Sequence, residues 1–401
     1  MKVPVAIETQ PHARHVTWPL TRLDVAGAFG DIGVLFPIAI ALITLNHLNP
    51  TALFLAAGIT YCLAARYFQI PIAVQPFKAV AAIALALALS PSEIASAGLL
   101  MGVLLLLVGV TNLAGWLAKL FTLPIVRGIQ FGLGLMLAWE GLRLVMGAQS
   151  AQSLPGGKLA SWLTALAGVT VLLALRESRR FPAALVLLIL GILLGVALQG
   201  GKLPVWRFGP VPLQLLHPQF SELKRVLPLL VVPQFALTFS NSIVATENTA
   251  RILYGEQAHR VTVRALSLSI GMVNLATAAI LGSPLCHGSG GITAHYRFGA
   301  RTPKSSYVIG GVCIFLASFG RAAVGLLQLI PAAVLGVLLL YVGIQHGAYV
   351  RDILRNLPFL AIAICVGVVS LLTTNLMWGF LTGFTLQGFL WLSRRSVQQR
   401  A

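Results

Sequence analysis

Two charged side chains lie inside apolar stretches of the sequence. Asp31 stands in the run GAFGDIG, and Lys78 stands in the run PIAVQPFKA. A carboxylate or an ammonium among apolar residues costs free energy, so each is a candidate for binding or proton transfer. Each also has a structural alternative: Asp31 could pair with an arginine, and Lys78 could extend its ammonium towards water. We favour a functional role for Lys78 and leave both interpretations of Asp31 open.

Pro76 predicts a break in the helical pattern just before Lys78. Proline lacks an N–H group and pushes the preceding residue, Gln75, towards extended geometry. The pattern therefore predicts a short extended piece and then a helix that begins near Pro76. The unpaired N–H groups at the start of such a helix attract anions, and the charge of Lys78 would add to that attraction.

A third motif, PQFALTFSNSIVATEN, carries small polar side chains on an apolar background. Thr238, Asn241 and Ser242 are spaced so that they share one face of a helix. Hydroxyls and amides can bind an anion, but they also join membrane helices by hydrogen bonds, and both interpretations stay open. Glu247, near the end of the motif, is a candidate proton carrier.

The fourth motif, SPLCHGSGGIT, combines His287 with three glycines. Glycines destabilise a continuous helix, which favours a break whose backbone N–H groups face a cavity. A histidine there could donate to an anion or carry a proton near neutral pH, and its alternative is a packing residue. A metal site is not expected, because no further ligands stand at suitable spacing around Cys286 and His287.

The surrounding sequence predicts many membrane-spanning helices. Of its 401 residues, 57% are hydrophobic and 9% are charged, whereas soluble domains are about one quarter charged. Apolar runs of about 20 residues can each cross about 30 Å of hydrocarbon as a helix, and their continuity argues against a β-barrel. The net charge of +18 lies in short loops, which argues against a nucleic-acid partner. We predict an all-α fold with about fourteen spans at residues 23–46, 50–68, 72–90, 93–118, 122–147, 158–175, 181–199, 225–247, 260–281, 284–298, 304–326, 329–348, 356–372 and 374–393.

These spans divide into two groups of seven, at 23–199 and 225–393, joined by a polar linker at 200–224. Residues 1–22 and 394–401 are expected to be cytoplasmic, with no soluble regulatory domain. In this layout 20 of the 28 lysines and arginines lie on the cytoplasmic side and 7 lie outside, which fits the positive-inside rule; twelve spans would keep the same parity. An odd number of spans per half inverts the second half, as in many secondary transporters.

The four motifs fall at matching positions of the two halves. The breaks near Pro76 and His287 belong to the third and tenth predicted spans, so an inverted repeat would direct two helix N-termini to one point near the membrane midplane. Positive helix ends, an ammonium and neutral donors suit a small anion. The predicted anion-binding residues are Gln75, Lys78, Thr238, Asn241, His287, Gly288, Ser289 and Gly290.

At these motifs the sequence resembles the molybdate transporter family, within the wider sulfate permease superfamily. The resemblance rests on GAFGDIGVLFPIAIAL, PIAVQPFKAVAAIA and PLCHGSGGITAHYRFGAR, which cover both halves from Gly27 to Arg301. It implies import of molybdate or sulfate by a fold whose core and gate domains move like an elevator. It is also compatible with proton coupling, for which the candidate residues are Asp31, Glu247 and His287.

Other functions stay open on the sequence alone. A nucleobase transporter of the same architecture is the nearest alternative, and a passive anion channel is another. An enzyme is not expected, because no catalytic motif surrounds the acids and the histidine, and no Walker A sequence indicates an ATP-driven pump. We expect no cofactor, a place in the inner cell membrane, and both termini in the cytoplasm. The sequence does not decide whether molybdate or sulfate is the preferred anion, or whether the protein is a monomer or a homodimer.

Overall fold

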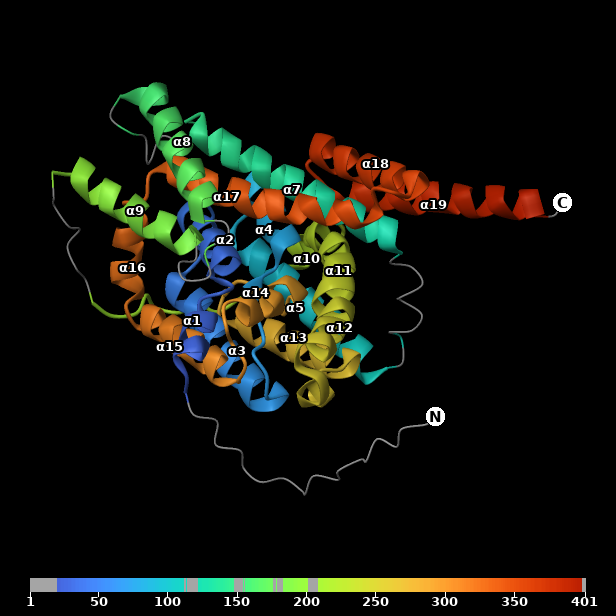
Figure 1. Cartoon of the computed structure of the whole chain (residues 1–401), viewed down its shortest axis with the longest axis horizontal. Coiled ribbons are helices and arrows are strands. Elements are labelled where there is room, and N and C mark those ends of the chain that lie inside the picture. The colour runs from blue at the N-terminus through green and yellow to red at the C-terminus, as the bar shows by residue number, and fades with distance from the viewer. Residues whose placement is uncertain are drawn as a thin grey trace, which may run out of the picture.

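The chain folds almost entirely into helices, as expected (Figure 1). The computed structural model describes residues 20–111, 113, 122–147, 154, 156–175, 178, 183–200 and 208–398. The first half holds α1 (Arg22–Ala28), α2 (Ile32–Leu45), α3 (Pro50–Phe68), β1 (Gln75–Pro76), α4 (Lys78–Leu87), α5 (Pro91–Val110), α7 (Leu123–Val145), α8 (Gly157–Leu175) and α9 (Ala183–Leu198).

The second half begins with one long helical stretch that contains two π-helical segments. Its elements are α10 (Phe220–Val226), the π-helix η2 (Leu227–Val231), α11 (Val232–Leu237), the π-helix η3 (Thr238–Val244), α12 (Ala245–Tyr254), the 3₁₀-helix η4 (Gly255–Arg260), α13 (Val263–Ala279), β2 (Leu285–Cys286), α14 (Ser289–Arg297), α15 (Lys304–Ser318), α16 (Gly320–Leu327), α17 (Ala332–Gly347), the 3₁₀-helix η5 (Ala348–Ile353), α18 (Leu357–Thr373) and α19 (Leu376–Gln398).

Side-chain caps fix where several of these helices begin. Asn49 accepts from the N–H of Ala52 ahead of α3, which has proline at its first position. Ser90 and Glu93 form a reciprocal capping box at the start of α5, which also opens with proline. A cap satisfies N–H groups that have no partner within the helix, and proline at the first position removes one of them.

Helices long and apolar enough to cross a membrane occur throughout the described residues. Six qualify, and a seventh is added if α15 and α16, which meet at a bend of 78°, form one span. Large apolar side chains such as Leu63, Leu166 and Leu193 face outwards, as expected of helices in contact with lipid. The protein is therefore a multi-pass membrane protein. Because five further apolar helices are shorter, the count of fourteen spans stays a prediction.

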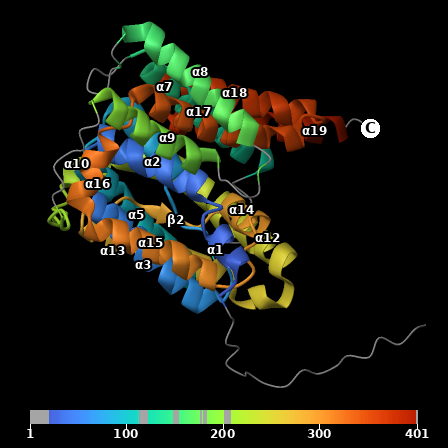
Figure 2. The same cartoon turned by 60° about the vertical axis from the view of Figure 1, so that its left-hand side comes forward.

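The helices pack in two groups, each containing elements of both halves of the sequence. In one group α3 packs on α15 and α5 packs on α13; in the other α7 packs on α17 and α18, and α19 packs on α18. Figures 1 and 2 show α7, α8, α17, α18 and α19 along one side of the molecule, and α3, α13 and α15 on the opposite side. Between them, α2 contacts α17, and α4 contacts α7.

Glycines let the backbones of α7 and α17 approach closely. A Cβ atom on Gly141 would lie 2.4 Å from the carbonyl oxygen of Gly336, and a Cβ atom on Gly134 would lie 2.6 Å from that of Gly343. Small residues at such crossings allow the van der Waals contact that holds membrane helices together.

A two-residue antiparallel β-pair lies among the helices and is the exception to the expected all-α fold (Figure 2). Gln75 pairs with Cys286, and Pro76 pairs with Leu285. The pair is extended by the N–H of Phe77, which donates to the carbonyl of Pro284 at 2.9 Å. Since α4 follows β1 and α14 follows β2, this pairing brings the starts of two short helices together.

Candidate functional site

The carboxylate of Asp31 lies against the first turn of α14. Its Oδ1 accepts a hydrogen bond from Nε2 of Gln75 at 2.5 Å. Asp31 is only 2% exposed, yet its Oδ2 and the Oε1 of Gln75 have no hydrogen-bond partner among the described residues. A Cβ atom on Gly291 would lie 2.8 Å from Asp31 Oδ2 and 2.8 Å from Gln75 Nε2, so both side chains occupy the space that this glycine leaves. The site thus holds two buried acceptors without donors.

Lys78 places a buried positive charge at the first position of α4. Its side chain is 5% exposed and interacts electrostatically with Asp31. Within the part of the chain that the structure describes, its ammonium forms neither an ion pair nor a hydrogen bond with a side chain. Buried charges are usually paired or hydrogen-bonded, so this arrangement favours an anionic ligand.

The N-terminus of α4 is capped by a side chain that the sequence analysis did not select. Oε1 of Gln234, on α11, accepts from the N–H groups of Ala79 at 2.9 Å and Val80 at 3.2 Å. Nε2 of Gln234 in turn donates to Thr238 at 2.8 Å. Two of the amides expected to face an anion are therefore already paired.

The N-terminus of α14 is open by comparison. Gly288 is its N-cap, and no side chain among the described residues accepts from the first turn. Ser289 donates its hydroxyl to Oδ1 of Asn241 at 2.9 Å. Gly290 is exposed, and a Cβ atom on it would lie 2.8 Å from the hydroxyl of Tyr349. The amides of this turn are donors that an anion can use.

The π-helix η3 holds the two predicted residues of the third motif. Thr238 is buried and accepts from Gln234, whereas Asn241 leaves its Nδ2 without a partner among the described residues. Ser242 hydrogen-bonds Cys286 of β2. π-Helical segments are rare in proteins, and those that occur are often found at functional sites. The π-helical geometry of η3 therefore fits a role in positioning Asn241.

His287 is buried and hydrogen-bonded on both ring nitrogens. Nδ1 donates to the carbonyl of Ala73 at 3.0 Å, and Nε2 lies 3.0 Å from the hydroxyl of Ser269. A neutral ring with its proton on Nδ1 satisfies both contacts. The ring also meets Phe68 edge to face at 5.7 Å between centroids. These contacts favour a structural role, which was the alternative that the sequence left open.

Glu247 stands apart from the other candidates. It forms an ion pair with Arg251, four residues further along α12, at 2.7 Å. No hydrogen bond or ion pair among the described residues joins Glu247 to Asp31 or Lys78. The structure therefore brings Asp31, Gln75 and Lys78 together with the first turn of α14 and leaves Glu247 outside that cluster.

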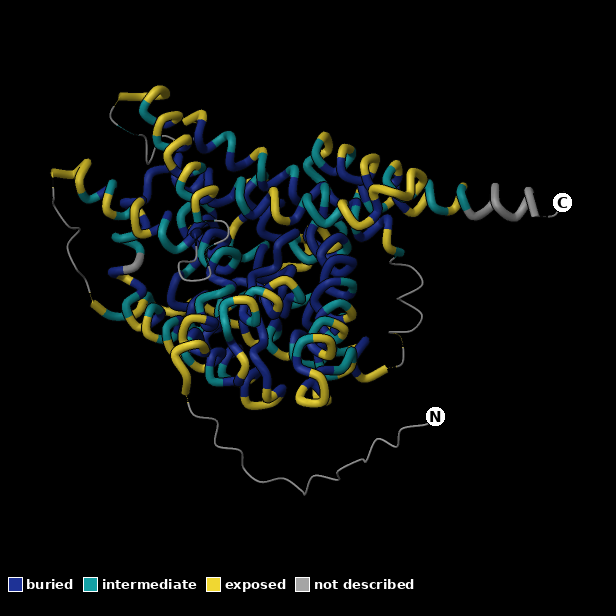
Figure 3. Tube along the Cα trace, in the orientation of Figure 1, coloured by how far each residue is buried: buried dark blue, intermediate teal, exposed yellow. Residues whose placement is uncertain are grey.

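The side chains of Asp31, Gln75 and Lys78 are buried, and Figure 3 shows that buried backbone is found in the interior of the helix bundle. Two contributors to this cluster, Gln234 and Tyr349, were missed by the sequence analysis. Gln234 follows a proline in the third motif, which is a weak signal, and Tyr349 carries no local signal at all. The described residues include no group of three potential metal ligands.

Known proteins that are similar to this chain are transporters. Residues 24–137 and 227–345 match the family described as "Molybdate transporter of MFS superfamily". Molybdate transporter 2 of Arabidopsis thaliana is 29% identical over 93% of this chain and 88% of its own length. Molybdate transporter 1 of Chlamydomonas reinhardtii is 25% identical over 94% and 92%. A probable sulfate transporter of Mycobacterium tuberculosis is 25% identical over 63% of this chain and 46% of its own length.

Solved structures share the fold at low sequence identity. The transmembrane domain of the cyanobacterial bicarbonate transporter BicA aligns with a TM-score of 0.67 at 19% identity, covering 90% of this chain and 97% of that domain. The structure of SLC26A9 aligns with a TM-score of 0.66 at 15% identity, covering 93% of this chain and 65% of that chain. The matched family covers more than half of the sequence, and its relatives and structural neighbours are transporters rather than enzymes. The chain therefore belongs to the molybdate transporter family of anion transporters.

Proposed function

We propose that this protein is a secondary active transporter that imports a tetrahedral oxyanion, molybdate or sulfate. The observation that carries the proposal is the uncapped first turn of α14, which adjoins Asp31, Gln75 and Asn241, together with the charge of Lys78, which interacts electrostatically with Asp31. Open N–H groups at a helix N-terminus bind anions, and a buried ammonium adds a full positive charge. An oxyanion of charge −2 would bind both the N–H groups of α14 and the ammonium of Lys78.

The proposed substrate is supported by the relatives that align over most of their length, since they are named molybdate transporters. A probable sulfate transporter aligns over a shorter region, and sulfate has the same shape and charge as molybdate. A neutral nucleobase would not neutralise Lys78, which makes that alternative weaker. A passive channel needs a continuous wet path, whereas Lys78 and Asp31 are both buried.

We propose Asp31 as the site of proton coupling. Its ionised carboxylate repels an anion beside Lys78, and protonation removes that repulsion. Proton binding and anion binding therefore favour each other, and this coupling is reciprocal. Glu247 and His287 are weaker candidates, because each is already held by protein partners.

Asp31→Asn tests this proposal. The variant keeps an oxygen that can accept from Gln75 but cannot ionise, so anion binding should no longer weaken as pH rises. The measurement is molybdate affinity of the purified protein from pH 5 to pH 8, with Glu247→Gln as the control that keeps the dependence of the unchanged protein. An Asp31→Asn variant with a normal pH dependence would remove Asp31 from the mechanism.

We propose that transport moves one helix group against the other. The group of α1–α5 and α10–α15 would be the mobile core and would carry the site, and the group of α7–α9 and α17–α19 would be the gate. This is supported by the tight packing within each group and by the fold shared with BicA and SLC26A9. The seven-span repeats at 23–199 and 225–393, cytoplasmic termini and a place in the inner cell membrane belong to the same proposal.

Uptake by proteoliposomes tests the function directly. Purified protein should take up labelled molybdate in a saturable way, with sulfate as a competitor. Accumulation should be driven by an inward proton gradient and abolished by a protonophore. Saturable uptake of neither anion would overturn the proposal, and uptake that never exceeds equilibrium would favour a channel.

A further inference from the structure

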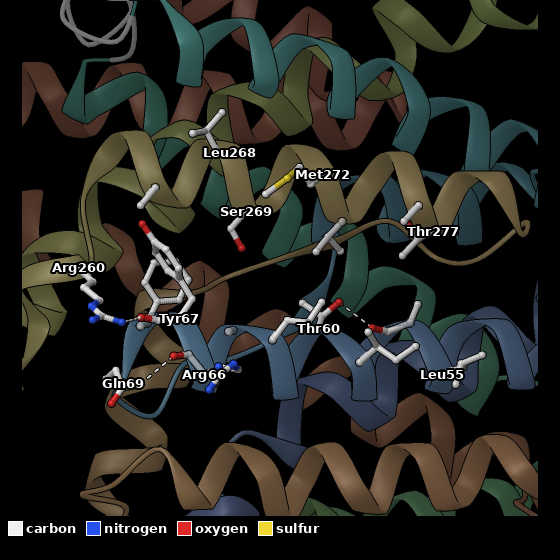
Figure 4. A pocket seen from close by; sticks show the side chains of 18 of the residues that line it. Leu55, Thr60, Arg66, Tyr67, Gln69, Arg260, Leu268, Ser269, Met272 and Thr277 are labelled. Atoms are coloured by element: carbon white, nitrogen blue, oxygen red, sulfur yellow. Dashed lines mark hydrogen bonds between the residues drawn. The ribbon is translucent and has the colours of Figure 1, made fainter. Parts of the chain in front are cut away.

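A groove lies between α3 and α13. Its volume is about 840 Å³, within the range of 300–1,000 Å³ typical of pockets for small molecules. Figure 4 shows side chains of both helices pointing into it. Ile59, Leu63 and Met272 line the groove and are exposed, so it opens on the outer surface of the helix bundle. In a membrane protein such a surface faces lipid.

The wall of the groove offers almost no free polar group along most of its length. Thr60 donates its hydroxyl to the carbonyl of Ala56, and Thr277 donates to the carbonyl of Asn274. Ser269 is hydrogen-bonded to His287. The remaining wall consists of apolar side chains such as Leu55, Leu268 and Val273. This lining fits a hydrocarbon chain and does not suit a polar solute.

One end of the groove is cationic. Arg66 and Arg260 line it there, beside Tyr67 and Gln69 (Figure 4). Arg260 donates to the backbone carbonyl of Tyr67 at 3.2 Å. Neither arginine forms an ion pair with any described residue. Two guanidinium groups at the end of an apolar groove match an anionic head attached to a hydrocarbon tail.

The length of the groove agrees with such a ligand. Its lining on α3 runs from Leu55 to Gln69, which corresponds to about 21 Å at 1.5 Å per residue. One leaflet of a bilayer holds about 15 Å of hydrocarbon, half of the total thickness. A lipid with its phosphate at the two arginines therefore has room for an extended acyl chain beside α3.

We propose that this groove binds an anionic phospholipid, with the phosphate on Arg66 and Arg260 and one acyl chain between α3 and α13. The site is distinct from the transport site and does not depend on the transported anion. It adjoins that site through two side chains of its wall, because Phe68 and Ser269 both contact His287. A bound lipid would therefore brace the segment that precedes α14.

The head-group contacts are tested with phosphatidylglycerol and phosphatidylcholine added to delipidated, full-length protein in detergent. Native mass spectrometry should show tighter retention of phosphatidylglycerol. In the variant Arg66→Gln/Arg260→Gln the affinity for phosphatidylglycerol should fall by about 25-fold, because each arginine near a membrane surface contributes a factor of about five. Arg351→Gln/Arg355→Gln removes two exposed arginines outside the groove and should change nothing. Equal binding of both lipids, or no effect of the groove arginines, would overturn the proposal.

The acyl-chain contact is tested by filling the groove. Ala276 lines it, whereas Ala279 is exposed on the same helix but does not. Ala276→Trp should abolish phosphatidylglycerol retention, and Ala279→Trp should keep it. Unchanged retention in Ala276→Trp would overturn the proposal. A loss of dimer mass in Ala276→Trp with retention intact would do the same, because a second copy of the chain would then cover the groove.

Discussion

The starts of α4 and α14 lie side by side but supply positive potential in different ways. At α4 the amides of Ala79 and Val80 are occupied by Gln234, and the positive charge comes from Lys78. At α14 no side chain in the described part of the chain caps the first turn, and the positive potential comes from open backbone amides. The comparison teaches that two helix starts brought together by one β-pair need not have the same role. The start of α4 contributes a side-chain charge, and the start of α14 contributes backbone N–H donors.

The largest effect is expected when the charge at α4 is removed. Lys78→Gln should weaken molybdate binding by about 10- to 100-fold, because hydrogen bonds to charged groups contribute about 1.5–3 kcal/mol. Stability without anion should fall much less than affinity, because Lys78 forms neither an ion pair nor a side-chain hydrogen bond with any described residue. Calorimetric titration measures the affinity for molybdate, and thermal unfolding measures the stability. Lys224→Gln, at an exposed lysine, is the control. Unchanged affinity in Lys78→Gln would show that α14 acts alone.

A smaller but still clear effect is expected when α14 is pushed away from β1. In Gly291→Ala the new Cβ atom would lie 2.4 Å from the Cβ of Ala73, which forces the backbones apart. We expect a loss of about 1–3 kcal/mol in stability and about tenfold in molybdate affinity. Gly311→Ala has open space around the new atom and should be tolerated. Equal behaviour of the two variants in unfolding and binding assays would contradict the close fit of α14.

Removing the cap of α4 should lower the stability of the protein but leave its affinity for molybdate nearly unchanged. Gln234→Leu leaves two buried N–H groups unpaired, at a cost of about 1–3 kcal/mol. Molybdate affinity should change by less than about threefold, because these amides do not face the ligand. Thermal unfolding and titration of the same preparations measure this, with the exposed Gln328→Leu as the control. An affinity loss as large as that of Lys78→Gln would mean that Gln234 touches the anion.

The smallest effect is expected at Glu247. Its pair with Arg251 links residues four apart on one helix, and such pairs contribute about 0.3–0.5 kcal/mol. Glu247→Gln should therefore change uptake by less than about twofold, and its pH profile should match that of the unchanged protein. A flattened pH profile would identify Glu247 as a proton carrier.

Much of the local architecture could be predicted from residue type. Pro76 and the glycines after His287 predicted where helices begin, and α4 and α14 begin at Lys78 and Ser289. These signals are local, because proline and glycine change the backbone at their own positions. Whether each segment belongs to one broken span, and whether there are fourteen spans, stays a prediction.

Long-range partners could not be predicted in this way. Gln234 caps a helix that begins more than 150 residues earlier, and a glutamine has no signature that announces such a contact. His287 could be a ligand or a packing residue until its two partners, Ala73 and Ser269, were known. Tyr349 approaches Gly290 only through the packing of the two helix groups. Such side-chain partners are set by the tertiary fold, and the sequence around each residue does not show which distant residue it will contact.

The pairing of β1 with β2 has a consequence for how the protein is made. Contacts at this β-pair connect residues far apart in the sequence, such as Ala73 and His287, which are 214 positions apart. At a synthesis rate of about 5–20 residues per second, α4 waits roughly 10–40 s before its partner leaves the ribosome. During that interval Lys78 sits in an unfinished bundle without the elements that later enclose it. The newborn first half is therefore expected to hold this charge before the segments that contact it in the folded protein have been made.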